Sequence, residues 1–245
     1  MQLKNDLFIV CNQCNKVLMI SKDDLEADST SYERKMGNEN EILFHGSFYC
    51  DNCPNEISIE ITGFEYPTMC FNYSTELCNG GDFLIPPSWS VSEFYMMSED
   101  ALSMYLPKVE KQIYNIACKN EYYSKLTPRE FEIAVEKIFN SIGFNTVLTP
   151  ATNDGGKDII AYAKYNDKPF IIYIECKRYK STNKVGVSII RELFGVQQAD
   201  NINSSIVVTT SDFTKGSHSF ANKRKVKINL VNSDILIRLA RNYLN

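Results

Sequence analysis

The chain has 245 residues, of which 44% are hydrophobic and 23% are charged. These values are ordinary for globular proteins and exclude a disordered, collagen-like or coiled-coil chain. The net charge of −4 is unevenly spread: residues 1–120 hold 8 Lys/Arg and 18 Asp/Glu, whereas residues 121–245 hold 18 Lys/Arg and 12 Asp/Glu. We therefore predict an acidic module followed by a basic module that meets a polyanion.

The first twenty residues lack the basic and apolar regions of a signal peptide, so we expect a cytoplasmic protein. No apolar run approaches the ~20 residues that a membrane-spanning helix needs, and we expect no membrane partner. Thiols stay reduced in the cytosol, where clustered cysteines indicate a metal site rather than disulfides.

The chain has two pairs of cysteines with two residues between the members of each pair: Cys11 with Cys14, and Cys50 with Cys53. A gap of two residues lets a tight turn aim both thiolates at one ion, and two such turns close a tetrahedral site. We predict that the four cysteines bind a structural Zn²⁺; four ordinary reduced cysteines are the alternative. For Cys70, Cys78, Cys118 and Cys176 we expect free, buried thiols.

The cysteine pairs lie among short strand patterns. Leu7–Val10 and Lys16–Ile20 are expected to form a hairpin around the first pair, and Glu41–Tyr49 and Glu56–Thr62 to flank the second. The acidic stretch Lys22–Asn40 between the pairs is expected to be a polar insertion. Residues 1–90 are thus predicted to be a small β-rich, ribbon-like zinc-binding domain.

A Pro- and Ser-rich segment, Pro86–Ser90, marks the predicted end of that domain. Residues 91–125 are expected to be a helical linker, with one helix starting after Ser98, a break at Pro107 and a second helix over Lys108–Ser124. Residues 126–245 form the remaining domain.

This last domain begins with a capping box, Thr127-Pro128-Arg129-Glu130, followed by apolar residues at helical spacing as far as Ile142. The later patterns predict the order α-β-β-β-α-β-α-β-α, an α/β fold with a mixed sheet flanked by helices. The expected elements are strands at Phe144–Leu148, Asp158–Lys164, Phe170–Arg178, Ser205–Thr210 and Val226–Val231, and helices at Val187–Ala199, Thr214–Arg224 and Ser233–Leu244.

Three charged residues stand at strand ends in this domain. Glu175 and Lys177 end an apolar strand and share one face, because side chains alternate along a strand. If the preceding strand forms a hairpin with this one, Asp158 comes beside Glu175. Two carboxylates with the Cys176 carbonyl suit Mg²⁺ (or Mn²⁺), a hard ion that activates water against a phosphodiester, and Lys177 would orient that water. Solvated strand ends are the alternative.

On the first helix, Glu132 and Glu136 lie one turn apart, and we expect Glu132 to reach the same metal site. Only two histidines, His45 and His218, occur in the chain. Nuclease chemistry that depends on several histidines is therefore nearly excluded.

The stretch from Leu126 to about Leu236 resembles the catalytic domain of Mrr-type restriction endonucleases, within the PD-(D/E)xK nuclease superfamily. The matching motifs are residues 127–132, Gly143-Phe144, residues 154–158, residues 175–179 and residues 208–214. The resemblance implies a restriction-endonuclease-like fold, Mg²⁺-dependent DNA cleavage and a role in defence against foreign DNA. It assigns Asp158, Glu175 and Lys177 as the catalytic triad and Glu132 as an auxiliary acid. Lys157 replaces the Pro of the family pattern.

Basic residues near these motifs are expected to contact DNA phosphates, with a solvated surface as the alternative. They are Lys157, Arg178, Lys180, Lys223, Arg224 and Lys225. The predicted function is a metal-dependent DNA endonuclease that works as a homodimer or with a partner protein of a defence system. A non-catalytic DNA-binding protein on the same fold and a junction-selective nuclease are the alternatives.

Overall fold

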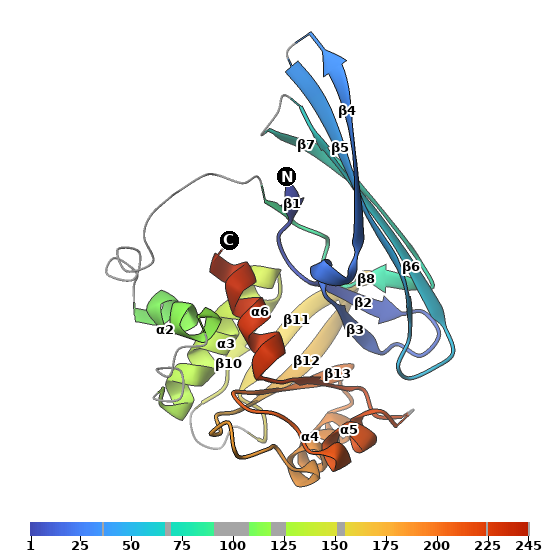
Figure 1. The fold of residues 1–245 in the computed structure, drawn as a ribbon. Helices are drawn as coiled ribbons and strands as arrows, with labels where there is room; N and C mark the ends of the chain where they lie inside the picture. Colours follow the sequence, from blue (N-terminus) through green and yellow to red (C-terminus); the bar gives the residue numbers. More distant parts are fainter. Residues whose placement is uncertain are drawn as a thin grey trace. The chain divides into compact units, whose positions relative to one another are not determined.

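The chain folds as two units, and the computed structural model describes residues 1–35, 37–66, 70–90, 108–118, 126–150, 155–223 and 225–244. The first unit is Met1–Met96 and the second is Met97–Leu244. Each is described by itself (Figure 1). The domain boundaries drawn from sequence at residues 90 and 125 stay a prediction. Among the described residues, no helix is long and apolar enough to cross a membrane.

The first unit begins with the hairpin expected around the first cysteine pair. Strands β2 (Leu7–Cys11) and β3 (Val17–Ile20) pair antiparallel, with Leu7 opposite Ile20. Strand β8 (Gly81–Phe83) adds to the other edge of β2. The short strands β1 (Gln2–Leu3) and β9 (Trp89–Ser90) pair with each other.

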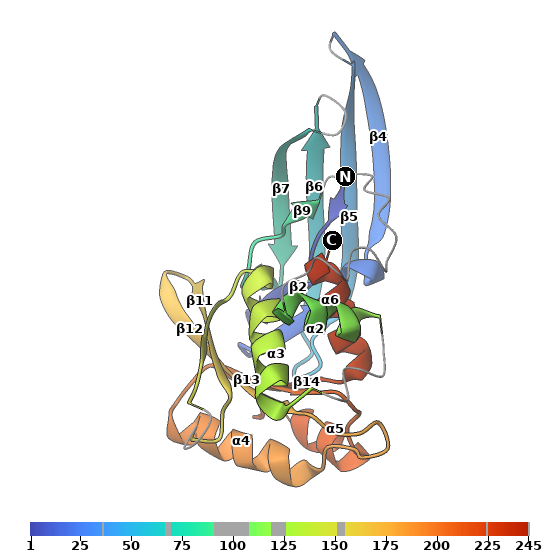
Figure 2. The same cartoon turned by 90° about the vertical axis from the view of Figure 1, so that its left-hand side faces the viewer.

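A four-stranded antiparallel sheet, in the order β4-β5-β6-β7, completes the first unit (Figure 2). Its strands are β4 (Glu26–Arg34), β5 (Gly37–Tyr49), β6 (Glu56–Glu65) and β7 (Phe71–Asn79). The strand expected at Glu56–Thr62 is confirmed as part of β6, in which Ile57, Ile59 and Ile61 are buried in the core of the unit.

The polar stretch Lys22–Asn40 is largely exposed, and the sequence predicted no helix or strand within it. This stretch makes a 3₁₀ turn, η1 (Lys22–Asp24), then β4 and the start of β5. All nine residues of β4 are exposed. An exposed strand needs no alternation of apolar and polar residues, so the sequence carries no strand signal there.

The expectation of free, buried thiols outside the cysteine pairs holds only in part. Cys176 is buried and Cys78 is half-buried, but Cys70 and Cys118 are exposed. Cys70 precedes the edge strand β7, and Cys118 follows the end of α2 (Lys108–Ala117), so neither position is covered by core.

The first described element of the second unit is α2, which packs against α3 (Pro128–Ile142) and α6 (Ser233–Leu244). The predicted capping box is confirmed: the Thr127 side chain accepts from the Glu130 N–H, and the Glu130 carboxylate accepts from the Thr127 N–H. The helix expected after Ser98 and the end of the one expected over Lys108–Ser124 lie outside the described residues.

The predicted mixed sheet is present in the order β10-β11-β12-β13-β14. Strands β10 to β12 pair antiparallel, whereas β12 to β14 are parallel. Helices α3 and α6 pack on the sheet, and α4 and α5 pack with each other and on β13 and β14 (Figure 1). The bounds are β10 Asn145–Leu148, β11 Ile159–Tyr165, β12 Lys168–Lys177, α4 Val187–Ala199, β13 Ser204–Thr209, α5 Lys215–Ala221 and β14 Ile228–Val231.

Candidate active site and cysteine cluster

The β11–β12 hairpin brings Asp158 and Glu175 side by side, as predicted. Ile159 pairs with Ile174, and the Asp158 N–H donates to the Ile174 carbonyl at 3.0 Å. Further along β12, the amide of Cys176 donates to Asp158 Oδ2 at 2.6 Å. The first carboxylate is thus fixed by the backbone of the strand that carries the second.

Local backbone geometry sets this hairpin. Strands β11 and β12 are joined by Asn166 and Asp167, whose φ angles of 50° and 58° make the left-handed two-residue turn that suits a hairpin. On the other side, Gly155 and Gly156 both have positive φ, shortly before Asp158. A Cβ on Gly156 would lie 3.1 Å from Val196 Cγ2. The close contact between the backbone at Gly156 and Val196 therefore also favours glycine.

Lys177 lies on the same face of β12 as Glu175, and its Nζ forms an ion pair with Glu175 Oε1. Burial alone would lower the pKa of Lys177, but the hydrogen bond to Glu175 and the nearby Asp158 carboxylate raise it above its ordinary value. Lys177 is therefore a cation at neutral pH. The second oxygen of the carboxylate, Glu175 Oε2, is buried and has no hydrogen-bond partner among the described residues.

Asp158 has a strongly perturbed pKa. Its side chain is buried, with 8% of the residue exposed, and burial raises the pKa from 3.8 to about 7. The negative charges of Glu175 and Glu132 add to the rise, while the Cys176 N–H and Lys177 oppose it. Such a perturbation, caused by both burial and like charge, is typical of a functional site.

Helix α3 supplies the third carboxylate. Glu132 acts on Asp158 electrostatically, whereas Glu136 is held by the Thr146 hydroxyl on β10. Glu132 was the residue we expected at the site, and its charge is near enough to raise the pKa of Asp158. Among the described residues, however, the three carboxylates are not close enough to form one ligand cluster.

Arg129 connects α3 to the loop before Asp158, a role that the sequence did not indicate. Its Nη1 donates to Glu132 Oε2 and to the Thr149 carbonyl, each at 2.9 Å. The buried Thr149 hydroxyl donates to the carbonyls of Lys157 and Asp158 at 2.8 and 2.9 Å. Arg129 and Thr149 thus connect the side chain of Glu132 to the backbone of Asp158 through hydrogen bonds.

Residues at the end of β13 hold the backbone at the end of β12 and just beyond it. Thr209 Oγ1 donates to the Lys177 carbonyl at 2.7 Å, and Thr210 Oγ1 donates to the Tyr179 carbonyl and accepts from its N–H. These residues belong to a motif of the family resemblance, but no role for them was predicted from the sequence. The structure gives them a positioning role.

The basic residues that we expected at DNA have different surroundings. Lys180, Lys223 and Lys225 are exposed. Arg178 is half-buried and has a partner of its own. Lys157 forms an ion pair with Asp200 at 3.2 Å and lies over the Tyr173 ring, so any phosphate contact would compete with that pair. Arg224 lies outside the described residues.

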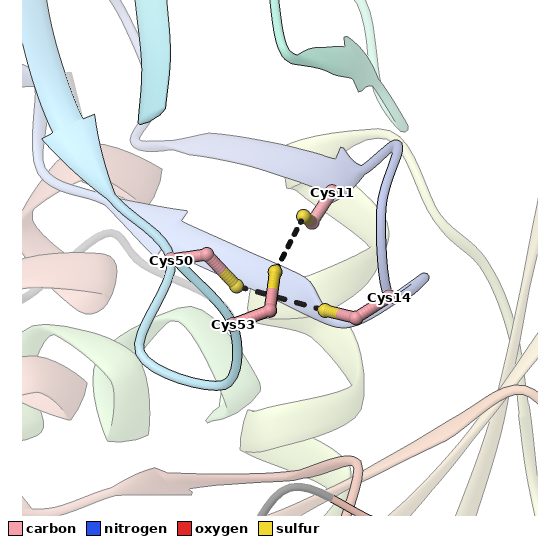
Figure 3. Close-up of side chains that lie close together, drawn as sticks. All are labelled: Cys11, Cys14, Cys50 and Cys53. Carbon is pink, nitrogen blue, oxygen red and sulfur yellow. Dashed lines mark hydrogen bonds between the residues drawn. The ribbon is translucent and has the colours of Figure 1, made fainter. Parts of the chain in front are cut away.

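The four paired cysteines converge in the first unit (Figure 3). Their sulfur atoms all lie within 4.8 Å of one another. The Sγ atoms of Cys11 and Cys53, and those of Cys14 and Cys50, are 3.6 Å apart. Zn–S bonds of about 2.3 Å in a tetrahedron place sulfurs about 3.8 Å apart. The spacing therefore fits one zinc ion with four thiolates and no open position.

Neighbouring groups favour a thiolate at Cys11, whereas burial raises the pKa of Cys50 and of Cys53. Although burial raises the pKa of Cys11, hydrogen bonds from the backbone of Gln13 and Cys14 and from Asn55 lower it to about 7. Asn55 Nδ2 lies 3.3 Å from the Cys11 sulfur and also donates to the Gly80 carbonyl. Across the turns, Lys16 pairs with Asp51 at 2.8 Å.

A family model of known proteins matches part of this chain. Residues 123–240 match the Mrr catalytic-domain family, described as "Restriction endonuclease". Over 89 residues the chain is 30% identical to the uncharacterized protein y4cE of Sinorhizobium fredii (strain NBRC 101917 / NGR234). That match covers 36% of this chain and 23% of the relative, so the chain spans about a quarter of the length of this relative.

Two solved structures of restriction endonucleases are also similar. The DNA modification-dependent restriction endonuclease AspBHI is 19% identical with a TM-score of 0.43, over 63% of this chain and 40% of that chain. MspJI restriction endonuclease in complex with a 27-mer oligonucleotide is 14% identical with a TM-score of 0.44, over 63% of this chain and 36% of that chain.

Proposed function

We propose that this chain, whose residues 123–240 form a restriction-endonuclease domain of the Mrr type, is a metal-dependent DNA endonuclease acting in restriction of foreign DNA. The observation that carries the proposal is the convergence of Asp158, Glu175 and Lys177 at one end of the β11–β12 hairpin. Two buried carboxylates beside a held cation cost stability, and a purely structural role offers no reason to retain them.

The carboxylates fit a hard divalent ion. Within the part of the chain that the structure describes, Glu175 Oε2 is buried without a hydrogen-bond partner. Asp158 uses Oδ2 for the Cys176 N–H, which leaves Oδ1 for another ligand. An oxygen donor set of this kind suits Mg²⁺ or Mn²⁺. We propose Asp158, Glu175 and the Cys176 carbonyl as the residues that hold it. When bound, the ion would polarise a phosphoryl oxygen and acidify a coordinated water.

The side chains of the protein have separate tasks in this proposal. Lys177 stays charged because of Glu175, and it would orient the attacking water and offset negative charge that develops on the phosphate. Glu132 lies beside the pair rather than within it, so it acts as an auxiliary acid, through a water. Arg129 and Thr149 keep Glu132 and Asp158 in a fixed relation.

DNA contact is assigned to exposed cations of the second unit. Lys180 follows the triad on the same chain segment, and Lys223 and Lys225 follow the end of α5. We propose that these residues bind phosphates, with Arg178 and Arg224 in the same clusters. Lys157 contributes only if its pairing with Asp200 gives way.

For the first unit we propose a structural zinc ion held by Cys11, Cys14, Cys50 and Cys53. A closed set of four thiolates stabilises a fold but leaves no position for substrate. The zinc would tie the β2–β3 hairpin to the turn between β5 and β6.

The test is a cleavage assay with the full chain on unmodified, methylated and branched DNA, in Mg²⁺, in Mn²⁺ and in EDTA. Wild-type protein should nick or cut DNA with a metal and not with EDTA. Asp158→Ala and Lys177→Ala should each abolish cutting. The matched controls Glu192→Ala and Lys164→Ala remove exposed charges of the same unit and should cut normally.

The pattern of results separates the alternatives. Cutting by both triad variants at the wild-type rate would refute the site. Binding without any metal-dependent cutting would indicate a non-catalytic DNA-binding protein, and cutting confined to branched DNA would indicate a junction-selective nuclease.

A further inference from the structure

Strand β7 is one edge of the four-stranded sheet. Within the described residues it pairs only with β6, so the backbone groups on its other side have no strand partner. Its side chains are exposed for most of its length, including Tyr73 at 48% and Leu77 at 50%. A long, exposed edge with apolar side chains is a template for another strand.

The opposite edge of the same sheet is different. Strand β4 also has nine residues, but four of them are charged: Glu26, Asp28, Glu33 and Arg34. Strand β7 has a single charge, Glu76. Charged side chains on an edge discourage strand pairing. The sheet is therefore protected at β4 and open at β7.

The β7 sequence complements itself about its centre. In an antiparallel pair related by a two-fold axis at Thr75, Tyr73 lies opposite Leu77 of the second copy, and Leu77 opposite its Tyr73. Glu76 then faces Ser74 rather than another Glu76. Tyr73 already stacks on Phe64 of β6 at 4.3 Å, so the new pair would extend an existing apolar row.

From these observations we propose that β7 is a self-association surface, which pairs antiparallel with β7 of a second copy of this chain about Thr75. The two sheets then join as one continuous sheet. A nine-residue edge is about 30 Å long. Such a contact is at the small end of specific interfaces, so the dimer should be concentration-dependent in the micromolar range. The proposal does not depend on the nuclease function.

A single introduced thiol tests the register. Directly opposed residues in an antiparallel pair have Cα atoms about 4.5–5.5 Å apart, which is within disulfide range. Under mild oxidation, Thr75→Cys should give a cross-linked dimer, identified by mass spectrometry as a disulfide between the two introduced thiols. Thr30→Cys, at the centre of exposed β4, is the matched control and should not exceed wild type. The wild-type chain gives the background level of cross-linking through the exposed Cys70 and Cys118.

Association without a cross-link is measured by sedimentation of the full chain over about 1 to 100 µM, a range chosen to bracket the expected affinity. Thr75→Lys places two cations face to face and should weaken the dimer at least tenfold, while Thr30→Lys should not change it. Fluorescence of Trp89, whose ring stacks near Phe71, reports whether each variant keeps its sheet. No cross-link above wild type with Thr75→Cys, or equal cross-linking with Thr30→Cys, would overturn the proposal.

Discussion

Replacing Asp158 with Asn should stop cleavage and at the same time stabilise the protein above neutral pH. The carboxyl has a pKa of about 7 in the folded chain against 3.8 ordinarily, because it is buried beside two other carboxylates. Between these two pH values the folded state keeps the proton and the unfolded state releases it. Stability is therefore lost as the pH rises from about 4 to 7.

The size of this loss follows from the shift. A difference of about three pKa units corresponds to about 4 kcal/mol at pH 8, where the folded carboxyl is ionised, and to about 2 kcal/mol at pH 5. Asn keeps an oxygen that accepts from the Cys176 N–H but carries no charge. The melting temperature of the second unit should thus rise by roughly 10 °C at pH 8 and by about half as much at pH 5.

Differential scanning calorimetry at the two pH values measures this effect. Asp200→Asn is the control with the opposite sign: hydrogen bonds from Tyr173 and Lys157 lower the pKa of Asp200, so its loss should destabilise the fold at pH 8. Added Mg²⁺ should raise the melting temperature of wild type at pH 8 but not that of Asp158→Asn. The reasoning is refuted if Asp158→Asn melts at or below wild type at pH 8, or if its gain is equal at both pH values.

The other predictions concern separate parts of the chain. Lys177→Met should reduce cleavage by about 100- to 1,000-fold while DNA binding, measured by fluorescence anisotropy in Ca²⁺, stays within about twofold. Elemental analysis should find about one zinc per chain; Cys11→Ser should lose it and shift the emission of Trp89, the single tryptophan. Arg129→Ala should slow cleavage about 10- to 100-fold and raise the Mg²⁺ requirement, with partial rescue by Arg129→Lys. Lys180→Ala should lower the slope of log affinity against log salt by about one.

Much of the second unit was predictable because its signals are local. A capping box with helical spacing predicted α3, and apolar runs closed by turn residues predicted the strands. The pairing of Asp158 with Glu175 followed from one assumption, a hairpin between two neighbouring strands. The structure confirms that hairpin and shows its cause in the Asn166-Asp167 turn.

The features that the sequence did not predict depend on contacts between residues that are far apart in the chain. Arg129 reaches the Thr149 carbonyl twenty residues further along the chain, and Thr209 reaches Lys177 from a different strand. No spacing in the sequence indicates that Arg129 or Thr209 would bind a distant backbone carbonyl. In the first unit, β4 is stabilised by pairing with β5 and buries nothing, so it leaves no hydrophobic pattern to find.

The acidic first half and the basic second half of the sequence can be explained when the two units are considered one at a time. The exposed cations that we propose for phosphate contact, Lys180, Lys223 and Lys225, lie in the second unit. In the first unit, an acidic surface would repel a phosphate backbone, while the closed cysteine cluster organises the fold. In our proposals the two units thus divide the work: one binds and cuts DNA, and the other stabilises the chain and offers β7 for assembly. In these proposals, pairing through β7 would also supply two copies of the proposed site, one for each strand of a DNA duplex.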